Sequence, residues 1–424
     1  MKTARLVNIF IVVFVDLLGF GLILPLLPYY AETFEATPVV IGFIVASYAA
    51  ASLVGAPLMG RLSDRYGRRL ILLLSVTGTF IGYLLLGFAQ PIGTSLANLL
   101  APQAVNTFII GILFISRIID GFTGGNITVA QAYISDITDE TNRSRGLGVI
   151  GSAFGLGFII GPAAGGLLSR WGYDIPAFAA AGLAFLNLIS IFFFLPESLT
   201  LARRTATLQQ TRPAFTLKAL LEAINRPKVG PLLLVRTFIM LAFGMFQSVF
   251  ALFAQHKLNL SSQSTGLVLT YVGILSVLVQ GMGIGLLTKR YKDNTLIITS
   301  LWLMFIGLVG WALTPNLPIM LLVILPLSGG GWVVNTIITS AITKSVDSKE
   351  IGGMLGISTS LESITRVISP TLGGFLFGSI GMWAPGAFSA FVMLWAVWLA
   401  YRRIIQVKPT LESTPTEICC PDPS

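Results

Sequence analysis

The stretch Gly60-Arg-Leu-Ser-Asp64-Arg-Tyr-Gly-Arg-Arg69 recurs in degenerate form as Gly285-Leu-Leu-Thr-Lys289-Arg-Tyr-Lys-Asp-Asn294, at an offset of 225 residues. Each copy directly follows a long apolar segment. A second pair of segments, Gly161-Pro162-Ala-Ala-Gly165-Gly166 and Ser369-Pro370-Thr-Leu-Gly373-Gly374, repeats at an offset of 208. The two repeats, in the same order, predict a chain built from two homologous halves.

The composition indicates that both halves lie in a membrane. Hydrophobic residues make up 54% of the 424 residues and charged residues only 11%, against roughly 25% charged in ordinary soluble domains. A window of about 19 residues finds twelve apolar segments, each long enough to cross a bilayer as a helix. They are 6–29, 38–60, 70–90, 105–135, 145–168, 174–196, 229–254, 264–287, 295–313, 317–340, 352–377 and 384–403. We therefore predict an all-α polytopic membrane protein, since backbone groups in hydrocarbon must be bonded within helices.

The basic residues predict the orientation. With the N-terminus in the cytoplasm, only Arg170 and Lys257 fall on the outer side; Arg117 and Arg366 lie inside helices, and the other 23 of the 27 Lys and Arg residues lie at the inner side. Positive loops resist translocation, so both termini are expected to be cytoplasmic, in a plasma or inner membrane.

The first apolar segment is too long for a signal peptide and is expected to be retained as a helix. A polar, basic loop divides the spans six and six. The predicted parts are an N-terminal six-helix half (1–196), a cytoplasmic linker (197–228), a C-terminal six-helix half (229–403) and a cytoplasmic tail (404–424). Two repeated halves are typical of secondary transporters, with the site at the midplane between them.

Four motifs together resemble a known family. The segment 60–69 resembles the signature between helices 2 and 3 of the major facilitator superfamily. The segments Asp16-Leu-Leu-Gly-Phe-Gly-Leu-Ile-Leu-Pro25, Arg117-Ile-Ile-Asp120-Gly and 161–166 are similar to the branch of proton-driven drug antiporters that includes tetracycline-efflux proteins. This resemblance covers the chain up to about residue 404 and implies the major facilitator fold.

The 60–69 loop is a candidate gate. Asp64 is its one acid among several arginines, and a carboxylate there can lie at a helix N-terminus or bridge to the other half. The resemblance implies a partner near Gly352-Gly353. The alternative is a plain positive-inside anchor. The motif residues are Gly60, Asp64, Arg65, Gly67 and Arg68.

The fifth segment carries a glycine face. Gly157, Gly161 and Gly165 recur at four-residue spacing, with Pro162 and Gly166 beside them. This face lets a neighbouring helix approach closely, and Gly281 and Gly285 of the eighth segment are the expected matching face. The resemblance associates this pattern with antiport; tight packing without a coupling role is the alternative.

Ionisable residues inside the membrane are costly and mark functional sites. Asp16 has no charged neighbour one turn away, so it is the candidate proton carrier. Arg117 and Asp120 share a helix face, and the resemblance places Arg117 near Asp16. A static buried ion network is the alternative. The repeat places Leu241 at the position equivalent to Asp16, which predicts proton coupling in the N-terminal half.

Other polar residues are candidates for the substrate cavity. Glu362 and Arg366 form a pair at four-residue spacing that either neutralises itself or touches a charged substrate. The candidate amides are Asn126, Gln131, Gln247, Gln280 and Asn335. His256 and Lys257 are expected at the membrane interface.

Several classes of function are excluded. No nucleotide-binding Gly-Lys-Ser/Thr loop is present, and the single histidine supports neither a hydrolytic triad nor a zinc site. Cys419 and Cys420 form no disulfide scaffold, and the spread of basic residues does not predict nucleic-acid binding. We therefore expect a transporter without cofactor or metal, working as a monomer, that exchanges protons for lipophilic small molecules. A symporter or facilitator of a nutrient, or a non-transporting receptor or scaffold, are the alternatives.

Overall fold

The computed structural model describes residues 2–199, 217–347 and 350–405, and every regular element among them is helical. The expected all-α fold class is confirmed. Cys419, Cys420 and most of the predicted tail and linker lie outside the described residues. The principal helices are α1 (Lys2–Ile23), α2 (Leu27–Glu32), α3 (Pro38–Tyr66), α4 (Arg68–Gly87), α5 (Ala89–Leu100), α6 (Val105–Thr123), α7 (Asn126–Ile137), α8 (Glu140–Leu168), α9 (Ile175–Phe194), α11 (Leu217–Asn225), α12 (Gly230–Leu258), α13 (Ser262–Leu278), α14 (Ile284–Arg290), α15 (Asp293–Leu313), α16 (Leu317–Lys344), α17 (Ile351–Ser379) and α18 (Ala384–Ala400).

Twelve membrane crossings can be traced through the described helices. Eleven segments are long and apolar enough to cross a membrane. The twelfth is α17, whose 29 residues are long enough but include Glu362 and Arg366. The structure also corrects two details of the expected spans. Gly124 and Gly125 break the fourth span into α6 and α7, and the stretch between the predicted spans 70–90 and 105–135 is largely the helix α5.

Local sequence explains where the helices begin. Thr37, Ser261 and Asn316 precede α3, α13 and α16, and each side chain accepts a backbone N–H of the first turn. Such caps satisfy groups that a helix start leaves unbonded. At the other end of α3, Gly67 adopts a φ of +107°, which a side chain would strain, and lets α4 start at once.

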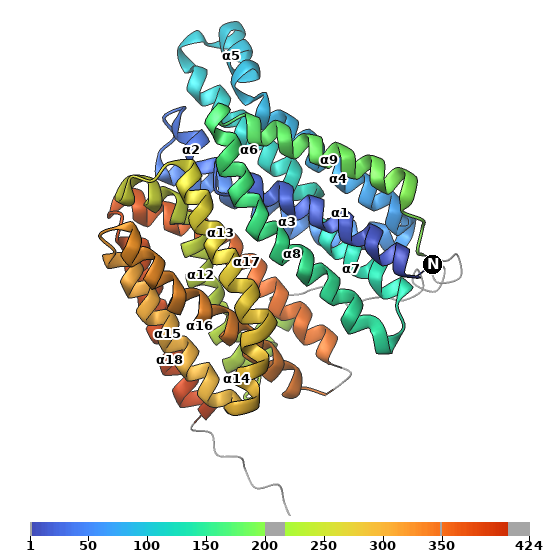
Figure 1. The fold of residues 1–424 in the computed structure, drawn as a ribbon, viewed down its shortest axis with the longest axis vertical. Coiled ribbons are helices and arrows are strands. Elements are labelled where there is room, and N and C mark those ends of the chain that lie inside the picture. The colour runs from blue at the N-terminus through green and yellow to red at the C-terminus, as the bar shows by residue number, and fades with distance from the viewer. Residues whose placement is uncertain (1, 200–216, 348–349, 406–424) are drawn as a thin grey trace, which may run out of the picture.

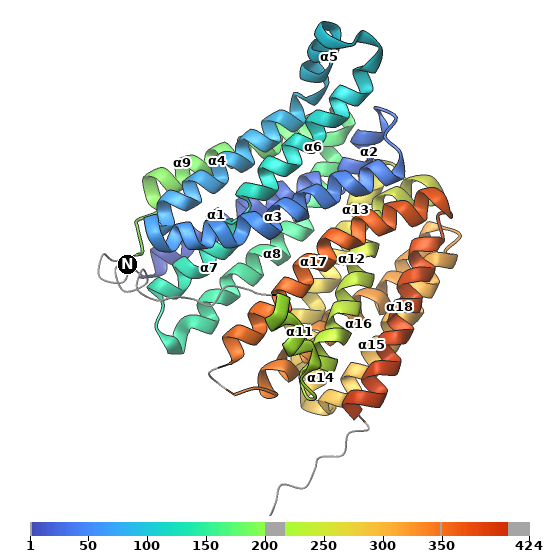
Figure 2. The same cartoon turned by 180° about the vertical axis from the view of Figure 1, so that it is seen from behind.

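The helices form two bundles that meet at one end only. Figures 1 and 2 show the bundle of α1 to α9 and the bundle of α12 to α18 leaning together near α2 and α13 and diverging toward the end where the chain begins. We call the end that carries residue 2 the N-side and the opposite end the far side. Across the seam, α3 packs on α17 and α8 packs on α13.

Glycines allow the close approach at the far side. A Cβ atom on Gly42 of α3 would lie 2.5 Å from the carbonyl oxygen of Pro370 in α17. Gly266 of α13 packs against Pro162 and Gly166 of α8 in the same way. On the N-side, a Cβ on Gly352 would meet nothing within 4 Å. Among the described residues, the two bundles are thus packed together at the far side and apart at the N-side.

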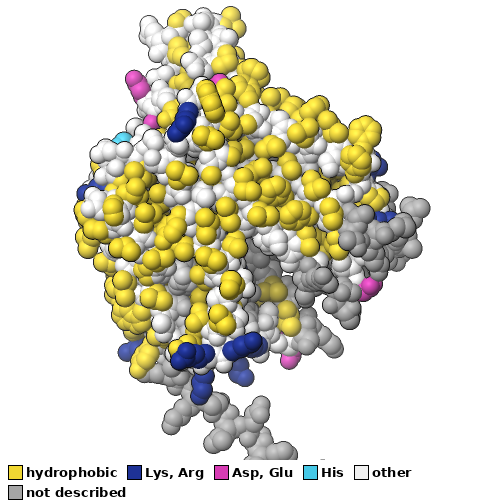
Figure 3. All heavy atoms as spheres, in the orientation of Figure 1, with side chains coloured by type: hydrophobic (Ala, Val, Ile, Leu, Met, Phe, Trp, Pro, Cys, Tyr) yellow, Lys and Arg dark blue, Asp and Glu magenta, His cyan; other side chains and the backbone are white. Residues whose placement is uncertain are grey.

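The surface fits a membrane environment. Figure 3 shows hydrophobic side chains over the broad middle of one face, with Lys and Arg gathered mainly at its lower end. Large apolar residues such as Phe193, Leu286 and Phe391 are 64% to 70% exposed. Exposed apolar area on this scale marks a surface that contacts lipid or another protein, and the long apolar helices favour lipid.

Candidate functional site

A small polar cavity lies within the first bundle. Its polar walls include Asp16 from α1, Asp120 from α6 and Asn126 from α7, with Tyr48 and Tyr83 beside them. Its volume is about 20 Å³, which is room for about one water molecule. In this conformation the cavity can therefore admit water, and it is too small for a drug-sized molecule.

The two acids of this cavity have different partners. Arg117 Nη1 lies 3.1 Å from Asp120 Oδ2, with both side chains about 95% buried. Asp16 makes no ion pair among the described residues, and the amide of Asn126 donates a hydrogen bond to it. Asp16 is therefore the acid of this site that lacks a compensating cation. The structure brings Asp16, Arg117 and Asp120 into one site, as the sequence predicted.

The guanidinium of Arg117 does not use all of its hydrogen-bond donors on Asp120. Its guanidinium lies over the Tyr83 ring, 5.4 Å from the centroid. Its Nη2 is buried and has no hydrogen-bond partner among the described residues. An unsatisfied buried donor is costly, so this nitrogen would be stabilised by a further acceptor.

The break between α6 and α7 orients Asn126. Because α7 starts at Asn126, this amide lies at a helix end rather than mid-helix. The Ser75 hydroxyl contacts both the carbonyl oxygen of Thr123 and Oδ1 of Asn126. Holding Oδ1 in this way turns the NH₂ group toward Asp16. Sequence reasoning found Asn126 but missed Ser75, since one serine in an apolar helix gives no signal.

The candidate gate motif is bound within its own bundle. Arg68 lies 2.6 Å from Asp64 and 3.1 Å from Asp136 of α7, and it donates to Ser63 Oγ at 2.7 Å. A Cβ atom on Gly352 or Gly353 would meet nothing within 4 Å in the described part of the chain. The partner expected for Asp64 near these glycines therefore stays a prediction.

Two acids that the sequence did not single out organise the loop. Glu197 accepts the backbone N–H groups of Arg68 at 2.9 Å and Arg69 at 3.1 Å, so it caps the start of α4. Asp136 accepts Arg68 and the Ser198 hydroxyl. Glu197 and Ser198 begin the predicted linker, and no spacing in the sequence links them to residue 68.

The glycine face of α8 packs mainly on α1. Cβ atoms on Gly157 and Gly161 would lie 3.0 Å from Leu17 Cβ and 2.7 Å from Gly21 Cα, and Gly165 meets Leu22. The close approach of a neighbouring helix is as predicted. The matching glycines predicted for the eighth segment are wrong, however. Cβ atoms on Gly281, just after α13, and on Gly285 of α14 would meet nothing within 4 Å, and Gly266 and Gly273 of α13 make the contacts instead.

A second charged cluster lies in the other bundle. Glu362 accepts a hydrogen bond from Arg366 at 2.7 Å through Oε1 and one from Arg236 of α12 at 3.3 Å through Oε2. Arg236 also donates to Thr339 of α16 at 2.7 Å. The sequence predicted the Glu362–Arg366 pair but assigned Arg236 to a helix end, and its 13% side-chain exposure corrects that. Its position in the first two turns of α12 hid this role.

The other candidate amides join neither cluster. Gln131 and Gln247 are exposed, and Gln280 donates to Ser276 at 2.7 Å. Asn335 lies one turn from Thr339, and its Oδ1 is buried without a partner. Asn335 is thus an acceptor for which the described protein supplies no donor.

The far-side residue His256 lies in the last turn of α12, and its Nε2 lies 2.7 Å from Glu32 of the other bundle. The same side holds hydrogen bonds from Tyr29 to Thr265 at 2.7 Å, and between Ser169 and Ser262 at 2.8 Å. Polar contacts between the bundles therefore reinforce the far-side seam.

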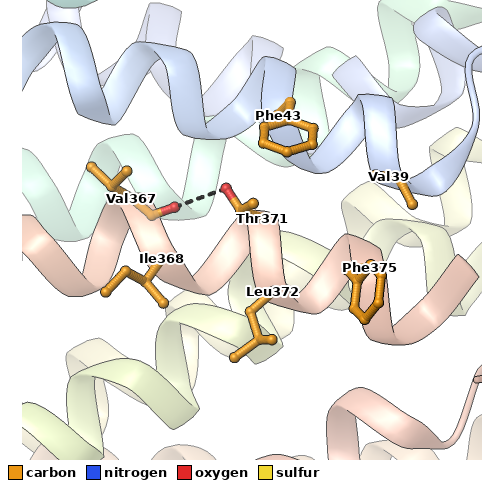
Figure 4. Close-up of a pocket in the computed structure, with 7 residues that line it drawn as sticks. All are labelled: Val39, Phe43, Val367, Ile368, Thr371, Leu372 and Phe375. Atoms are coloured by element: carbon orange, nitrogen blue, oxygen red, sulfur yellow. Dashed lines mark hydrogen bonds between the residues drawn. The ribbon is translucent and has the colours of Figure 1, made fainter. Parts of the chain in front are cut away.

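A larger groove runs along the α3–α17 seam. Figure 4 shows Val39 and Phe43 of α3 facing residues of α17. The groove encloses about 430 Å³ and its walls are almost wholly apolar. The Thr371 hydroxyl donates a hydrogen bond to the carbonyl oxygen of Val367 in its own helix. The groove therefore presents hydrocarbon and no charge. Its lining residues are Val39, Phe43, Val367, Ile368, Thr371, Leu372 and Phe375.

Two bundles of six crossings around buried charges can now be compared with known proteins. The sequence model of the Major Facilitator Superfamily matches residues 9–252 and 232–417. The chain belongs to this superfamily. It is therefore a multi-pass membrane transporter of small molecules and not an enzyme.

Individual relatives resemble the chain along most of its length. The tetracycline resistance protein of class H from Pasteurella multocida is 30% identical over 386 residues, 89% of this chain and 90% of that protein. Multidrug resistance protein 2 of Bacillus subtilis is 28% identical over 90% of each chain. The crystal structure of a D-xylose–proton symporter superposes with a TM-score of 0.69 at 17% identity, covering 93% of this chain and 96% of that one. That last likeness concerns the fold alone.

Proposed function

We propose that this protein is a proton-coupled antiporter that exports lipophilic small molecules from the cytoplasm by alternating access. The observation that carries the proposal is Asp16, a carboxyl without a counter-ion in a water-sized cavity. A group that must lose and regain a proton needs such a place, since an ionised acid without a cation is unfavourable away from water. The tetracycline and multidrug relatives support export of drug-like molecules.

The cycle follows from the two acids and Arg117. In this cycle Arg117 stays with Asp120 while Asp16 is protonated, and the Arg117–Asp120 pair of the structure supports this assignment. When Asp16 loses its proton toward the open N-side, its charge competes for the free Nη2 of Arg117. We infer that this exchange of partners favours closure of the N-side. Asp64 and the region around Gly352 would then face each other and form the gate at the N-side.

Orientation and location are part of the proposal. The predominance of basic residues at the N-side supports cytoplasmic termini, and we propose that the protein lies in a plasma or inner membrane. The structure is then the inward-open state. The packing of α8 on α1 through Gly157, Gly161, Pro162 and Gly165 ties the helix of Asp16 to the seam helix that carries Gly166. One six-plus-six chain holds the whole site, so we propose a monomer.

Everted membrane vesicles with an acidified interior test the proposal. A pH-sensitive dye reports proton leakage as lipophilic cations, neutral drugs, lipophilic acids and metabolites are added one by one. Antiport predicts that at least one lipophilic compound dissipates the gradient and accumulates inside. A compound that leaves the vesicles together with protons indicates symport instead. The absence of any coupled flux with inserted protein contradicts transport and favours the receptor or scaffold alternative.

A further inference from the structure

The charged cluster on α12 and α17 carries more positive than negative charge. Arg236 and Arg366 both bind Glu362, one on each carboxylate oxygen. The three side chains therefore have a net charge of +1. A lone excess cation within the membrane is costly and calls for an anionic partner.

Both arginines have N–H donors that their contacts with Glu362 do not use. Arg366 has five N–H donors, and its one ion pair among the described residues is made by Nη2. Its side chain is 68% exposed. The Nε of Arg236 is buried and has no hydrogen-bond partner in the described part of the chain. Glu362 cannot serve a cationic ligand in this state, because both of its oxygens already face guanidinium groups.

The position of Arg366 on α17 directs it at the other bundle. It lies four residues before Pro370, and residues at this spacing share a helix face. Pro370 packs against Gly42 of α3, so this face of α17 points across the seam. Arg366 is also within electrostatic range of Tyr48, which lines the cavity of Asp16. It therefore lies where the two bundles begin to separate.

Aromatic side chains continue this surface. Phe243 lies seven residues after Arg236 on α12, and its ring centroid is 5.6 Å from that of Trp332 in a T-shaped arrangement. Both rings are only partly buried. Trp332 is three residues from Asn335 on the same helix face, and no described residue bonds to its indole Nε1. An apolar body can thus stack beside the cluster.

We propose that this protein binds lipophilic organic anions, with their carboxylate on Arg366 and Arg236 and their apolar body against Phe243 and Trp332. This rests on the proposed transport function and names the class of its substrate. Glu362 takes the place of the substrate carboxylate when the site is empty. The arrangement opposes lipophilic cations, which would meet two arginines.

Binding of three compounds of one shape tests the charge preference. The probes are 1-naphthaleneacetate, its neutral amide and 1-naphthylethylammonium, added to the purified full-length protein in detergent. Ligand binding raises the unfolding temperature in a concentration-dependent way that yields a dissociation constant. We expect the acetate to bind at least tenfold more tightly than the amide, and the ammonium to leave the unfolding temperature unchanged.

Variants separate Arg366 from general charge. Arg366→Gln should weaken acetate binding at least tenfold, and Arg366→Lys should fall between it and the unchanged protein. Lys344→Gln removes one exposed cation that pairs with Asp293 and should leave binding unchanged. Equal acetate binding with and without Arg366, preferential ammonium binding, or no effect of any probe overturns the inference. Because this assay has no pH gradient, its outcome is independent of proton coupling, which the vesicle experiment tests.

Discussion

Asp16 and Asp120 share one cavity, but the protein stabilises them differently. Asp120 is held by the cation of Arg117, and Asp16 by the neutral amide of Asn126. Replacing one acid therefore has a different cost from replacing the other. Removing one partner of a buried ion pair leaves an uncompensated charge. The Asn126 amide, in contrast, can donate a hydrogen bond to the Asp16 carboxyl whether that group is protonated or ionised.

We therefore expect Asp120→Asn to destabilise the protein by about 3–5 kcal/mol, because Arg117 loses its counter-ion. Asp16→Asn should change stability far less. Thermal unfolding of the purified variants in detergent measures both. The double variant Asp120→Asn/Arg117→Gln should recover most of the loss, and failure to do so would show that the pair does not govern stability here.

The sequence identified most of these charged side chains but missed the residues that position them. Asp16, Arg117, Asp120, Glu362 and Arg366 stand out because charges in apolar helices are rare. Ser75 and Glu197 do not stand out, since their roles depend on helices distant in sequence. Arg236 was misplaced because a basic residue near a helix start is usual at a membrane surface.

At the level of elements, Glu197 links the end of α9 to the start of α4. Glu197→Ala removes the acceptor for two backbone N–H groups, and loss of such a cap costs about 0.5–2 kcal/mol. We expect a lower unfolding temperature for this variant. Glu222→Ala, which removes an exposed acid of α11 with a weak 4.0 Å contact to Lys218, is the control. Equal effects of the two changes would argue against the cap.

A second prediction concerns the contact of α8 with α13. Gly266→Val places a side chain against the backbone of Pro162 and Gly166, and overpacking of this kind costs about 1–3 kcal/mol. The far side should open, so an impermeant maleimide should label a cysteine there faster. Gly182→Val, at an exposed glycine of α9 with nothing within 4 Å, should leave labelling unchanged. Unaltered labelling in Gly266→Val contradicts the role of this seam.

The pattern of helices was largely predictable, and their pairing was not. Apolar length fixed the spans, apart from the break at Gly124 and Gly125, where two small residues follow an otherwise continuous apolar run. The glycines of α8 indicated close packing but not the partner. Choosing α1 over α13 requires the three-dimensional arrangement, and the four-residue spacing of Gly281 and Gly285 predicted a contact that this conformation does not make.

For the whole molecule, transport requires the far-side seam to part and the N-side to close. The hydroxyls of Ser169 and Ser262 lie 2.8 Å apart across that seam, a separation compatible with a disulfide between cysteines at these positions. In a background with Cys419 and Cys420 replaced by serine, Ser169→Cys/Ser262→Cys should lose transport on oxidation and recover it on reduction. Each single cysteine variant is the control. Continued transport in the oxidised double variant would contradict alternating access at this seam.

The central claim is that Asp16 carries the proton. The most direct test compares Asp16→Asn with the unchanged protein in proteoliposomes, using a compound that dissipates the gradient in vesicles. We predict that Asp16→Asn still exchanges labelled for unlabelled compound at equal concentrations but no longer accumulates it under a pH gradient. Asp293→Asn, which changes an exposed acid, should keep both activities. Full gradient-driven accumulation by Asp16→Asn would contradict the account.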